Sequence, residues 1–201
     1  MPAVALSLYV TFLATAFGLR ALIQYLRTGD HGLRGLAAGD GVIGLLRSSL
    51  LLMGSVLAGV APAAELFHLV QSPSISSATW LRAVGLALAV FGMAIAVLSQ
   101  YQMGDSWRVG IDLGESTPLI TTGIFGVIRN PIFTGTLLAT AGLLLLVPNY
   151  FSVAAFLALL VGLEMQVRWV EEPYLDRVHG ARYRSYARIA GRFLPGIGRL
   201  R

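Results

Sequence analysis

The clearest indication of fold class is the stretch PIFTGTLLATAGLLLLVPNYFSVAAFLALLVGLEMQVRW (residues 131–169). It contains two apolar runs, 131–147 and 150–169, separated only by Pro148 and Asn149. A helix that crosses a membrane needs about 20 mostly apolar residues, because each residue rises about 1.5 Å through a core of about 30 Å. Two such runs with so short a connection predict an antiparallel helical hairpin within a membrane.

Three further apolar runs of similar length come before this hairpin, at residues 4–26, 41–61 and 80–101. Together, the runs predict an all-α integral membrane protein with about five transmembrane helices. Arg20 lies near the end of the first run, where we expect its long side chain to reach the membrane surface.

The composition supports this class and excludes several others. Hydrophobic residues make up 56% of the 201 residues and charged residues only 12%, about half of the roughly 25% typical of soluble domains. A soluble enzyme, a disordered chain and a nucleic-acid-binding domain are therefore excluded. The chain has no Cys and only three scattered His, so we expect no disulfide, no thiolate nucleophile and no metal site.

The positions of the arginines predict the orientation in the membrane. All fifteen basic residues are Arg, and most lie in the segments 27–47, 102–130 and 168–201, whereas 62–79 and 148–149 have none. Short loops rich in Arg stay in the cytoplasm, so we expect the N-terminus outside and the C-terminus inside. The use of Arg without Lys, with abundant Ala, Leu and Gly, is typical of a high-GC bacterial genome. The expected location is therefore a bacterial inner membrane.

A long segment of mixed polarity, GDSWRVGIDLGESTPLITTGIFGVIRN (104–130), lies on the predicted cytoplasmic side. Loops of this length are usually functional or disordered, and its many apolar residues favour a packed structure. It leads into Pro131, and a helix that starts at Pro leaves backbone donors available in its first turn. The segment therefore either builds a site or simply leads into a membrane span.

Charged residues gather at the end of the last apolar run: Glu164, Arg168, Glu171 and Glu172. Glu164, Arg168 and Glu172 are spaced four residues apart, so they share one helix face. Ionisable residues within a span usually face a cavity or a partner and indicate function, and a salt-bridged helix end is the alternative. The basic and aromatic segment 179–201 is expected to form either a membrane-surface helix or a lid over a site.

Two runs in this half of the chain follow a known pattern: TTGIFGVIRNPIFTG (121–135) and VEEPYLDRVHGARYRSYARIAGRFLP (170–195). With the apolar hairpin between them, they resemble the isoprenylcysteine carboxyl methyltransferase family, which is related to the phospholipid N-methyltransferases. The family pattern runs from Arg-His-Pro-x-Tyr-x-Gly through two spans to a Glu-Glu pair, a Tyr-x-x-Tyr stretch and a closing Leu-Pro. The resemblance covers roughly residues 105–197.

The resemblance implies a methyltransferase that depends on S-adenosylmethionine and whose cofactor pocket faces the cytoplasm. Residues 1–103 would then form N-terminal transmembrane helices, and residues 104–201 the catalytic region. By their place in the motifs, the cofactor-binding residues would be Thr117, Pro118, Leu119, Ile120, Phe125, Asn130, Pro131, Ile132, Phe133 and Glu171. Aromatic faces attract a sulfonium, helix-start donors suit a carboxylate, and Glu171 would accept the ribose hydroxyls or the amino group.

The implied acceptor is a lipophilic small molecule or a lipid, for example one that bears a carboxylate. Arg129 or Arg168 would orient a carboxylate, which needs no base, whereas Glu164 would serve as the base for an amine, thiol or hydroxyl acceptor. Beyond this acceptor and the membrane lipids, we expect no nucleic acid and no obligate protein partner.

Four positions differ from the family pattern. Asn130 replaces a His, and Phe125 and Phe133 replace Tyr. Val167 stands where the prenylcysteine enzymes have an Arg that contacts the substrate, with Arg168 next to it. Two other functions stay open: a relative of the NADPH-dependent membrane sterol and lipid reductases, which resemble the family in the same half, and a non-catalytic membrane scaffold.

Overall fold

The structure is a computed structural model that describes residues 1–32, 41–73, 78–110 and 118–200. Apart from an isolated parallel bridge between Ile128 and Gly191, the regular structure of these ranges is helical, which confirms the predicted all-α class. The α-helices are α1 (Pro2–Leu13), α2 (Arg20–Thr28), α3 (Gly41–Leu66), α4 (Thr79–Met103), α5 (Pro131–Leu146), α6 (Tyr150–Gln166), α7 (Glu172–His179) and α8 (Ala181–Ile189). Two π-helical segments, Ala14–Leu19 and Val167–Glu171, join α1 to α2 and α6 to α7, and short 3-10 helices form at Gly104–Ser106 and Gly123–Gly126.

Within the described ranges, four helical stretches are long and apolar enough to cross a membrane: Pro2–Thr28, Gly41–Leu66, Thr79–Ser106 and Tyr150–His179. Each contains one of the predicted spans. The fifth predicted span corresponds to α5, which is apolar but has only 16 residues. A helix of this length is about 24 Å long, somewhat less than a hydrocarbon core of about 30 Å. Pro131 at its start and the 147–149 connection at its end limit its length.

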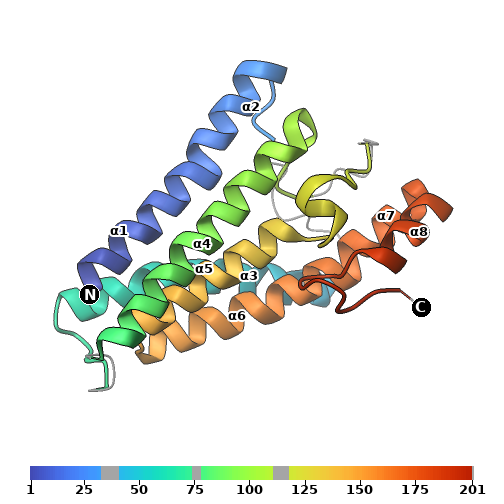
Figure 1. Ribbon diagram of the computed structural model, residues 1–201. Coiled ribbons are helices and arrows are strands. Elements are labelled where there is room, and N and C mark those ends of the chain that lie inside the picture. The colour runs from blue at the N-terminus through green and yellow to red at the C-terminus, as the bar shows by residue number, and fades with distance from the viewer. Residues whose placement is uncertain (33–40, 74–77, 111–117, 201) are drawn as a thin grey trace.

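Helices α4 and α5 pack against each other along stripes of small residues (Figure 1). A Cβ added to Gly92 of α4 would lie 2.4 Å from the nitrogen of Ala139 and 2.5 Å from the carbonyl oxygen of Gly135 on α5. A Cβ added to Gly142 would lie 2.4 Å from the nitrogen of Ala89. Lipid provides no hydrophobic force that drives helices together, so small residues that allow backbones to touch supply much of this association.

Helix α6 packs mainly along α3, where Gly54 and Gly162 provide the close approach. A Cβ on Gly54 would meet Leu159 at 2.7 Å, so this glycine allows close helix packing. Helices α5 and α6 are joined by only three residues, and the Asn149 side chain accepts hydrogen bonds from the first amides of α6. Even so, α5 packs mainly on α4 and α6 mainly on α3, rather than on each other.

The helices define two ends of the molecule. At the first end, Ala5 packs against Leu146 and Val147, and Asn149 Nδ2 donates to the carbonyl of Ala61 at 3.0 Å. At the second end, the Gln24 side chain donates to the Asp105 carbonyl at 2.8 Å, and the Ile124 amide donates to Gln102 Oε1 at 2.9 Å. The second end therefore joins α2, the end of α4 and the loop before α5.

Arg20, which was expected to reach the membrane surface, is instead buried among protein groups. The residue is only 5% exposed, its Nη2 donates to the Gly104 carbonyl, and its guanidinium carbon lies 4.7 Å from the centre of the Trp107 ring. A guanidinium over an indole face is attracted by the ring electrons, and this contact holds the side chain inside. Trp107 is itself buried, which confirms that the segment after α4 is packed.

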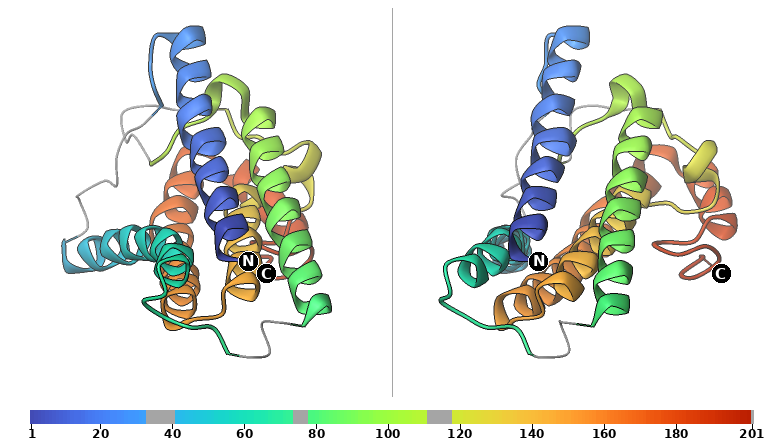
Figure 2. Two further views of the ribbon diagram at one scale, coloured as in Figure 1. Left: turned by 90° about the vertical axis from the view of Figure 1, so that its left-hand side faces the viewer. Right: turned by 60° about the vertical axis from the view of Figure 1, so that its left-hand side comes forward.

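The chain after α6 folds back on itself. Helices α7 and α8 and residues 190–200 lie beside the loop that precedes α5, shown in red and yellow at the same end of the molecule (Figures 1 and 2). Two segments that are distant in the sequence, 118–133 and 171–200, are thereby brought together next to the membrane-spanning helices.

Candidate functional site

Backbone hydrogen bonds join the loop before α5 to the C-terminal segment. The Arg129 amide donates to the Gly191 carbonyl at 2.7 Å, and the Gly191 amide donates to the Val127 carbonyl at 3.0 Å. Both flank the parallel bridge between Ile128 and Gly191. The two segments therefore form one structural unit.

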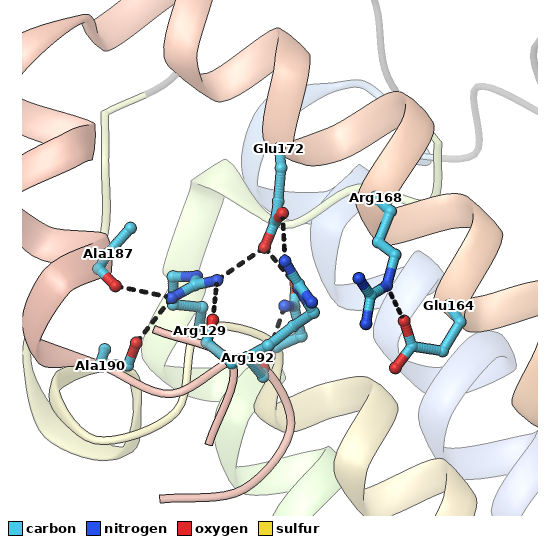
Figure 3. A network of polar contacts seen from close by, with 9 residues as sticks. Arg129, Glu164, Arg168, Glu172, Ala187, Ala190 and Arg192 are labelled. Carbon is cyan, nitrogen blue, oxygen red and sulfur yellow. Dashed lines mark hydrogen bonds and ion pairs between the residues drawn. The ribbon is translucent and has the colours of Figure 1, made fainter. Parts of the chain in front are cut away.

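Arg129 lies at the centre of this unit, with its side chain only 3% exposed (Figure 3). Its Nη1 donates to the carbonyls of Ala187 at 2.9 Å and Ala190 at 2.7 Å. Its Nη2 donates to Glu172 Oε1 at 2.7 Å and to the Gly198 carbonyl at 3.0 Å. A guanidinium has four Nη protons, so all four are used. Arg129, which the sequence suggested as an acceptor contact, instead holds the C-terminal segment against α7.

Glu172 accepts a second arginine in the same network (Figure 3). Arg192 donates from Nε to Oε1 at 2.7 Å and from Nη2 to Oε2 at 2.9 Å, a bidentate geometry that is stronger than a single bond. The hydrogen bonds to Glu172 raise the pKa of the Arg192 guanidinium, and the charge of Glu164 adds to the effect. Glu172 is thus fully engaged in holding two arginines.

The start of α5 offers hydrogen-bond donors, as the sequence predicted. The backbone amide and the side-chain Nδ2 of Asn130 both donate to the Arg192 carbonyl at 3.1 Å, so this side chain is engaged with the C-terminal segment. Helix α5 then begins at Pro131 with no side-chain cap among the described residues. The amides of Ile132 and Phe133 have no acceptor within the first turn. Both residues are half-buried.

Two of the predicted cofactor residues lie beneath α8. Leu119 packs with Tyr183 and Ala187, and the Phe125 carbonyl accepts a hydrogen bond from the Tyr186 hydroxyl at 2.6 Å. Burial raises the pKa of Tyr186 to about 12, so the hydroxyl keeps its proton at neutral pH and remains a donor. The Tyr-x-x-Tyr stretch therefore fixes the loop in place.

The remaining predicted residues of this loop are less constrained. Pro118 is exposed and Ile120 is half-buried. Thr117 lies outside the described residues. The structure therefore brings together the residues from Leu119 to Phe133 beneath the C-terminal segment.

Glu171 and Glu172 have different partners, although the two are adjacent. The π-helical segment Val167–Glu171 ends here, and such segments often occur at functional sites. Gln166 Nε2 donates to Glu171 Oε1 at 3.0 Å. In the described part of the chain, no hydrogen bond joins Glu171 to residues 118–133.

The predicted pairing of Glu164 and Arg168 is present: Arg168 Nε donates to Glu164 Oε2. Both side chains are partly exposed. Figure 3 shows this pair on the helix beside the network of Arg129, Glu172 and Arg192, but separate from it. Val167, at the position of the family's substrate-contacting Arg, is fully buried.

Sequence reasoning missed two residues that the structure makes prominent. Arg192 was one of many arginines in a basic tail, and nothing in its spacing linked it to Glu172. Arg47 was used only as an indicator of orientation, although it follows the start of an apolar run by six residues. An ionisable residue within a span was itself a signal.

The fold resembles that of a membrane protein of known structure. The structure matches the eukaryotic intramembrane Ras methyltransferase ICMT (isoprenylcysteine carboxyl methyltransferase) with a TM-score of 0.64 and 18% identity. The match covers 97% of this chain but 66% of that one, so this chain spans just under two thirds of its structural relative.

The chain belongs to the phospholipid methyltransferase family, which it matches over residues 80–182, about half of its length. It is 27% identical over 139 residues to a probable protein-S-isoprenylcysteine O-methyltransferase of Oryza sativa subsp. indica, covering 67% of this chain and 73% of the relative. It is 24% identical over 134 residues to protein-S-isoprenylcysteine O-methyltransferase A of Arabidopsis thaliana, covering 66% and 68%. The resemblance to the isoprenylcysteine methyltransferases is therefore confirmed.

Proposed function

We propose that this chain is an S-adenosylmethionine-dependent methyltransferase that transfers a methyl group to a lipophilic acceptor at the cytoplasmic side of a bacterial inner membrane. Residues 104–201 form the catalytic region, and residues 1–103 supply surrounding transmembrane helices. With α5 as a fifth span the two termini lie on opposite sides of the membrane, and the arginine-rich loops favour an outside N-terminus and a cytoplasmic C-terminus. The second end of the bundle, where the Arg-bearing segments meet, then faces the cytoplasm, as expected for a water-soluble cofactor.

The observation that carries this proposal is the division of roles between the two adjacent glutamates. Glu172 is occupied by Arg129 and Arg192, whereas Glu171 accepts a hydrogen bond from the neutral Gln166. A carboxylate has about four acceptor positions, so Glu171 has capacity for the hydroxyls or amino group of a cofactor. Of the pair, Glu171 is the residue that we assign to the cofactor.

The surrounding groups suit S-adenosylmethionine. The amides of Ile132 and Phe133 at the uncapped start of α5 suit its carboxylate. The rings of Phe125 and Phe133 supply faces that attract a sulfonium. The Asn130 side chain donates to the Arg192 carbonyl and so holds the loop in place. It would shape the cofactor site rather than donate a hydrogen bond to the cofactor. The cofactor, when bound, supplies a methyl group that is activated by a positively charged sulfur.

The chain's own contribution is mainly alignment, which supplies up to about 7–11 kcal/mol of a barrier when the reacting groups are held in line. Arg129 acts as a positioning residue, since its Nη protons are committed to the C-terminal segment. Glu164 takes a proton when the acceptor is an amine, thiol or hydroxyl, and Arg168, which donates to Glu164, holds its carboxylate in place. A carboxylate acceptor needs no base.

The reductase alternative requires cations that can bind the 2′-phosphate of NADPH. The C-terminal arginines were the available candidates, yet Arg192 is paired with Glu172 and Arg184 with Asp176 at 2.8 Å. These two arginines are therefore poor phosphate ligands, and the similarity to methyltransferases favours the methyltransferase over the reductase. A scaffold would bind neither cofactor.

The test is calorimetric titration of the detergent-solubilised protein with S-adenosylhomocysteine and, in parallel, with NADPH. We expect S-adenosylhomocysteine to bind and NADPH not to bind. Glu171→Gln should weaken S-adenosylhomocysteine binding by about 10- to 100-fold, the cost of one charge-assisted hydrogen bond. Asp176→Asn, which alters an exposed carboxylate on the adjoining helix, is the matched control and should bind normally. Equal affinities for the two variants would refute the assignment of Glu171, and NADPH binding alone would indicate a reductase.

A further inference from the structure

A short loop near the C-terminus presents apolar side chains at the surface of the molecule. The Arg192 amide donates to the Ile197 carbonyl at 2.7 Å, and the Ile197 amide donates to the Leu194 carbonyl at 3.1 Å, so residues 192–197 form a closed loop. Leu194 is 50% exposed and Ile197 is 64% exposed. Removal of such side chains from water is favourable, so a closed loop that holds two of them outward is suited to an apolar surrounding.

Hydrogen bonds fix the 192–197 loop at the depth where α5 begins. Asn130 Nδ2 donates to the Arg192 carbonyl at 3.1 Å, and Thr134 Oγ1 donates to the Phe193 carbonyl at 2.7 Å. Thr134 lies in the first turn of α5, an apolar helix. The loop is therefore level with the start of this helix and does not project away from the bundle.

Exposed aromatic residues mark the same level. At the second end of the bundle, Tyr101 is 62% exposed and Trp169 is 56% exposed, and Tyr and Trp gather where a membrane meets water. Glu172 follows Trp169 by three residues and accepts two hydrogen bonds from Arg192. These contacts hold the 192–197 loop at the level expected for lipid headgroups.

Positive charge lies beside the loop. Residues 179–201 contain six Arg and neither Asp nor Glu. Arg188 and Arg199 are exposed, and neither forms an ion pair with another residue in the described ranges. The Leu200 amide donates to the Ala187 carbonyl at 2.9 Å, which keeps Arg199 close to Arg188. The surface therefore combines apolar side chains with two arginines that are available to an anion.

A membrane surface fits this combination better than a soluble partner does. Segments that bind at the membrane interface use buried apolar area together with the attraction of basic residues to anionic lipids. Helix α8 begins two residues after the long apolar stretch that ends at His179. The chain itself thus holds the 192–197 loop next to the membrane.

We infer that Leu194 and Ile197 insert among the lipid headgroups at the second end of the bundle, where Arg188 and Arg199 bind the phosphate groups of anionic phospholipids. The partner is a membrane surface that contains a lipid such as phosphatidylglycerol. The long arginine side chains can follow the phosphates while their stems cover apolar surface. This inference is independent of the proposed methyl transfer.

The experiment places a polarity-sensitive fluorophore on the 192–197 loop of the protein in lipid nanodiscs. The chain has no Cys, so Ile197→Cys provides a single labelling position, and Leu194→Cys provides a second one in a separate series. The nanodiscs contain phosphatidylcholine alone or with increasing shares of phosphatidylglycerol, up to an equimolar mixture. The emission of the label gives the ratio of inserted to solvated loop.

Each labelled chain is compared with variants of three arginines: Arg188→Gln, Arg188→Lys, Arg199→Gln and Arg184→Gln. Arg184→Gln is the matched control, because Arg184 lies on the same helix as Arg188 but donates to Asp176 at 2.8 Å.

We expect the emission to shift toward that of an apolar environment as the share of phosphatidylglycerol rises. One basic residue near an anionic surface strengthens binding about fivefold, so Arg188→Gln and Arg199→Gln should each lower the ratio of inserted to solvated loop about fivefold. Arg188→Lys keeps the charge and should respond like the wild type. Arg184→Gln should have a smaller effect, because the Arg184 charge is already paired within the protein.

An emission typical of water in every lipid would overturn the inference and leave the loop available to a protein partner. An apolar emission that does not depend on phosphatidylglycerol would also overturn it, as would equal effects of Arg184→Gln and Arg188→Gln. If Arg188→Lys loses the response together with Arg188→Gln, the result for Arg199→Gln decides: a reduced response supports the inference and a wild-type response overturns it.

Discussion

Replacement of Glu172 by Gln should release the C-terminal segment while the membrane helices stay folded. Glu172 accepts one hydrogen bond from Arg129 and two from Arg192, at 2.7, 2.7 and 2.9 Å. Its side chain is 16% exposed and that of Arg129 is 3% exposed, so solvent screens the pair little. Gln removes the charge between two guanidiniums and directs an amide donor at one of them.

The magnitude follows from these contacts. Removal of one partner from a buried ion pair costs about 3–5 kcal/mol because the other charge is left uncompensated. Arg129 retains its bonds to three carbonyls, so we expect the lower limit, about 3 kcal/mol. This corresponds to about a 100-fold larger population in which residues 180–200 are detached.

Limited trypsin digestion in detergent measures this population, because trypsin cleaves after Arg and the segment contains several. When reclosing is fast, the cleavage rate follows the equilibrium population of the open form. Glu172→Gln should be cleaved in this segment about 100-fold faster than the wild type, while Asp176→Asn should be cleaved at close to the wild-type rate. Equal rates for Glu172→Gln and Asp176→Asn would refute the reasoning that Glu172 holds the segment.

Two further predictions concern packing and pH. Gly92→Ala should lower the free energy of unfolding by about 1–3 kcal/mol, since the new Cβ would meet backbone atoms of α5 at 2.4 and 2.5 Å. Gly18→Ala, where a Cβ has nothing within 4 Å, is the control and should leave the stability unchanged. Thermal unfolding in detergent compares the two variants, and equal melting temperatures would contradict the close contact of α4 and α5. Tyr186→Phe should cost about 1 kcal/mol through the lost bond to Phe125. The folded-state pKa of Tyr186 is raised to about 12, above the unfolded pKa of about 10. The protonated hydroxyl therefore adds fully to the stability of the wild type below about pH 10, and this stabilisation is lost as the pH rises to about 12. A pH titration of the melting temperature should show this loss in the wild type and a smaller one in Tyr186→Phe, and identical profiles would contradict it.

The membrane-spanning helices were predictable because hydropathy and length depend on local sequence. Runs of about 20 apolar residues cross a bilayer whatever their partners are, and the four long stretches correspond to predicted spans. Helix α5 was predicted to within one residue because Pro131 and the Pro148-Asn149 turn mark its ends in the sequence, although its 16 residues are fewer than a full span needs. Its packing on α4 rather than α6 depends on matching stripes of small residues on two separate segments.

The site was less predictable, because its charged side chains pair with residues that are distant in the sequence. Arg20 was expected to reach the membrane surface, but its guanidinium packs on the ring of Trp107. No local sequence pattern reveals this contact. Arg129 was expected to contact an acceptor, yet its partners are carbonyls of the C-terminal segment. Glu171 and Glu172 are adjacent, yet Gln166 donates to Glu171 and the distant Arg192 to Glu172, a difference that no local pattern reveals.

The most direct test of the central claim is methyl transfer itself. The purified protein is incubated in lipid nanodiscs with S-adenosylmethionine that carries a radioactive methyl group and with N-acetyl-S-farnesyl-L-cysteine, and the organic extract is counted. We expect label in the organic extract with the wild type and Asp176→Asn, and a large loss of label with Glu171→Gln. No label above background from a wild type that binds both molecules would contradict the proposed methyltransferase activity.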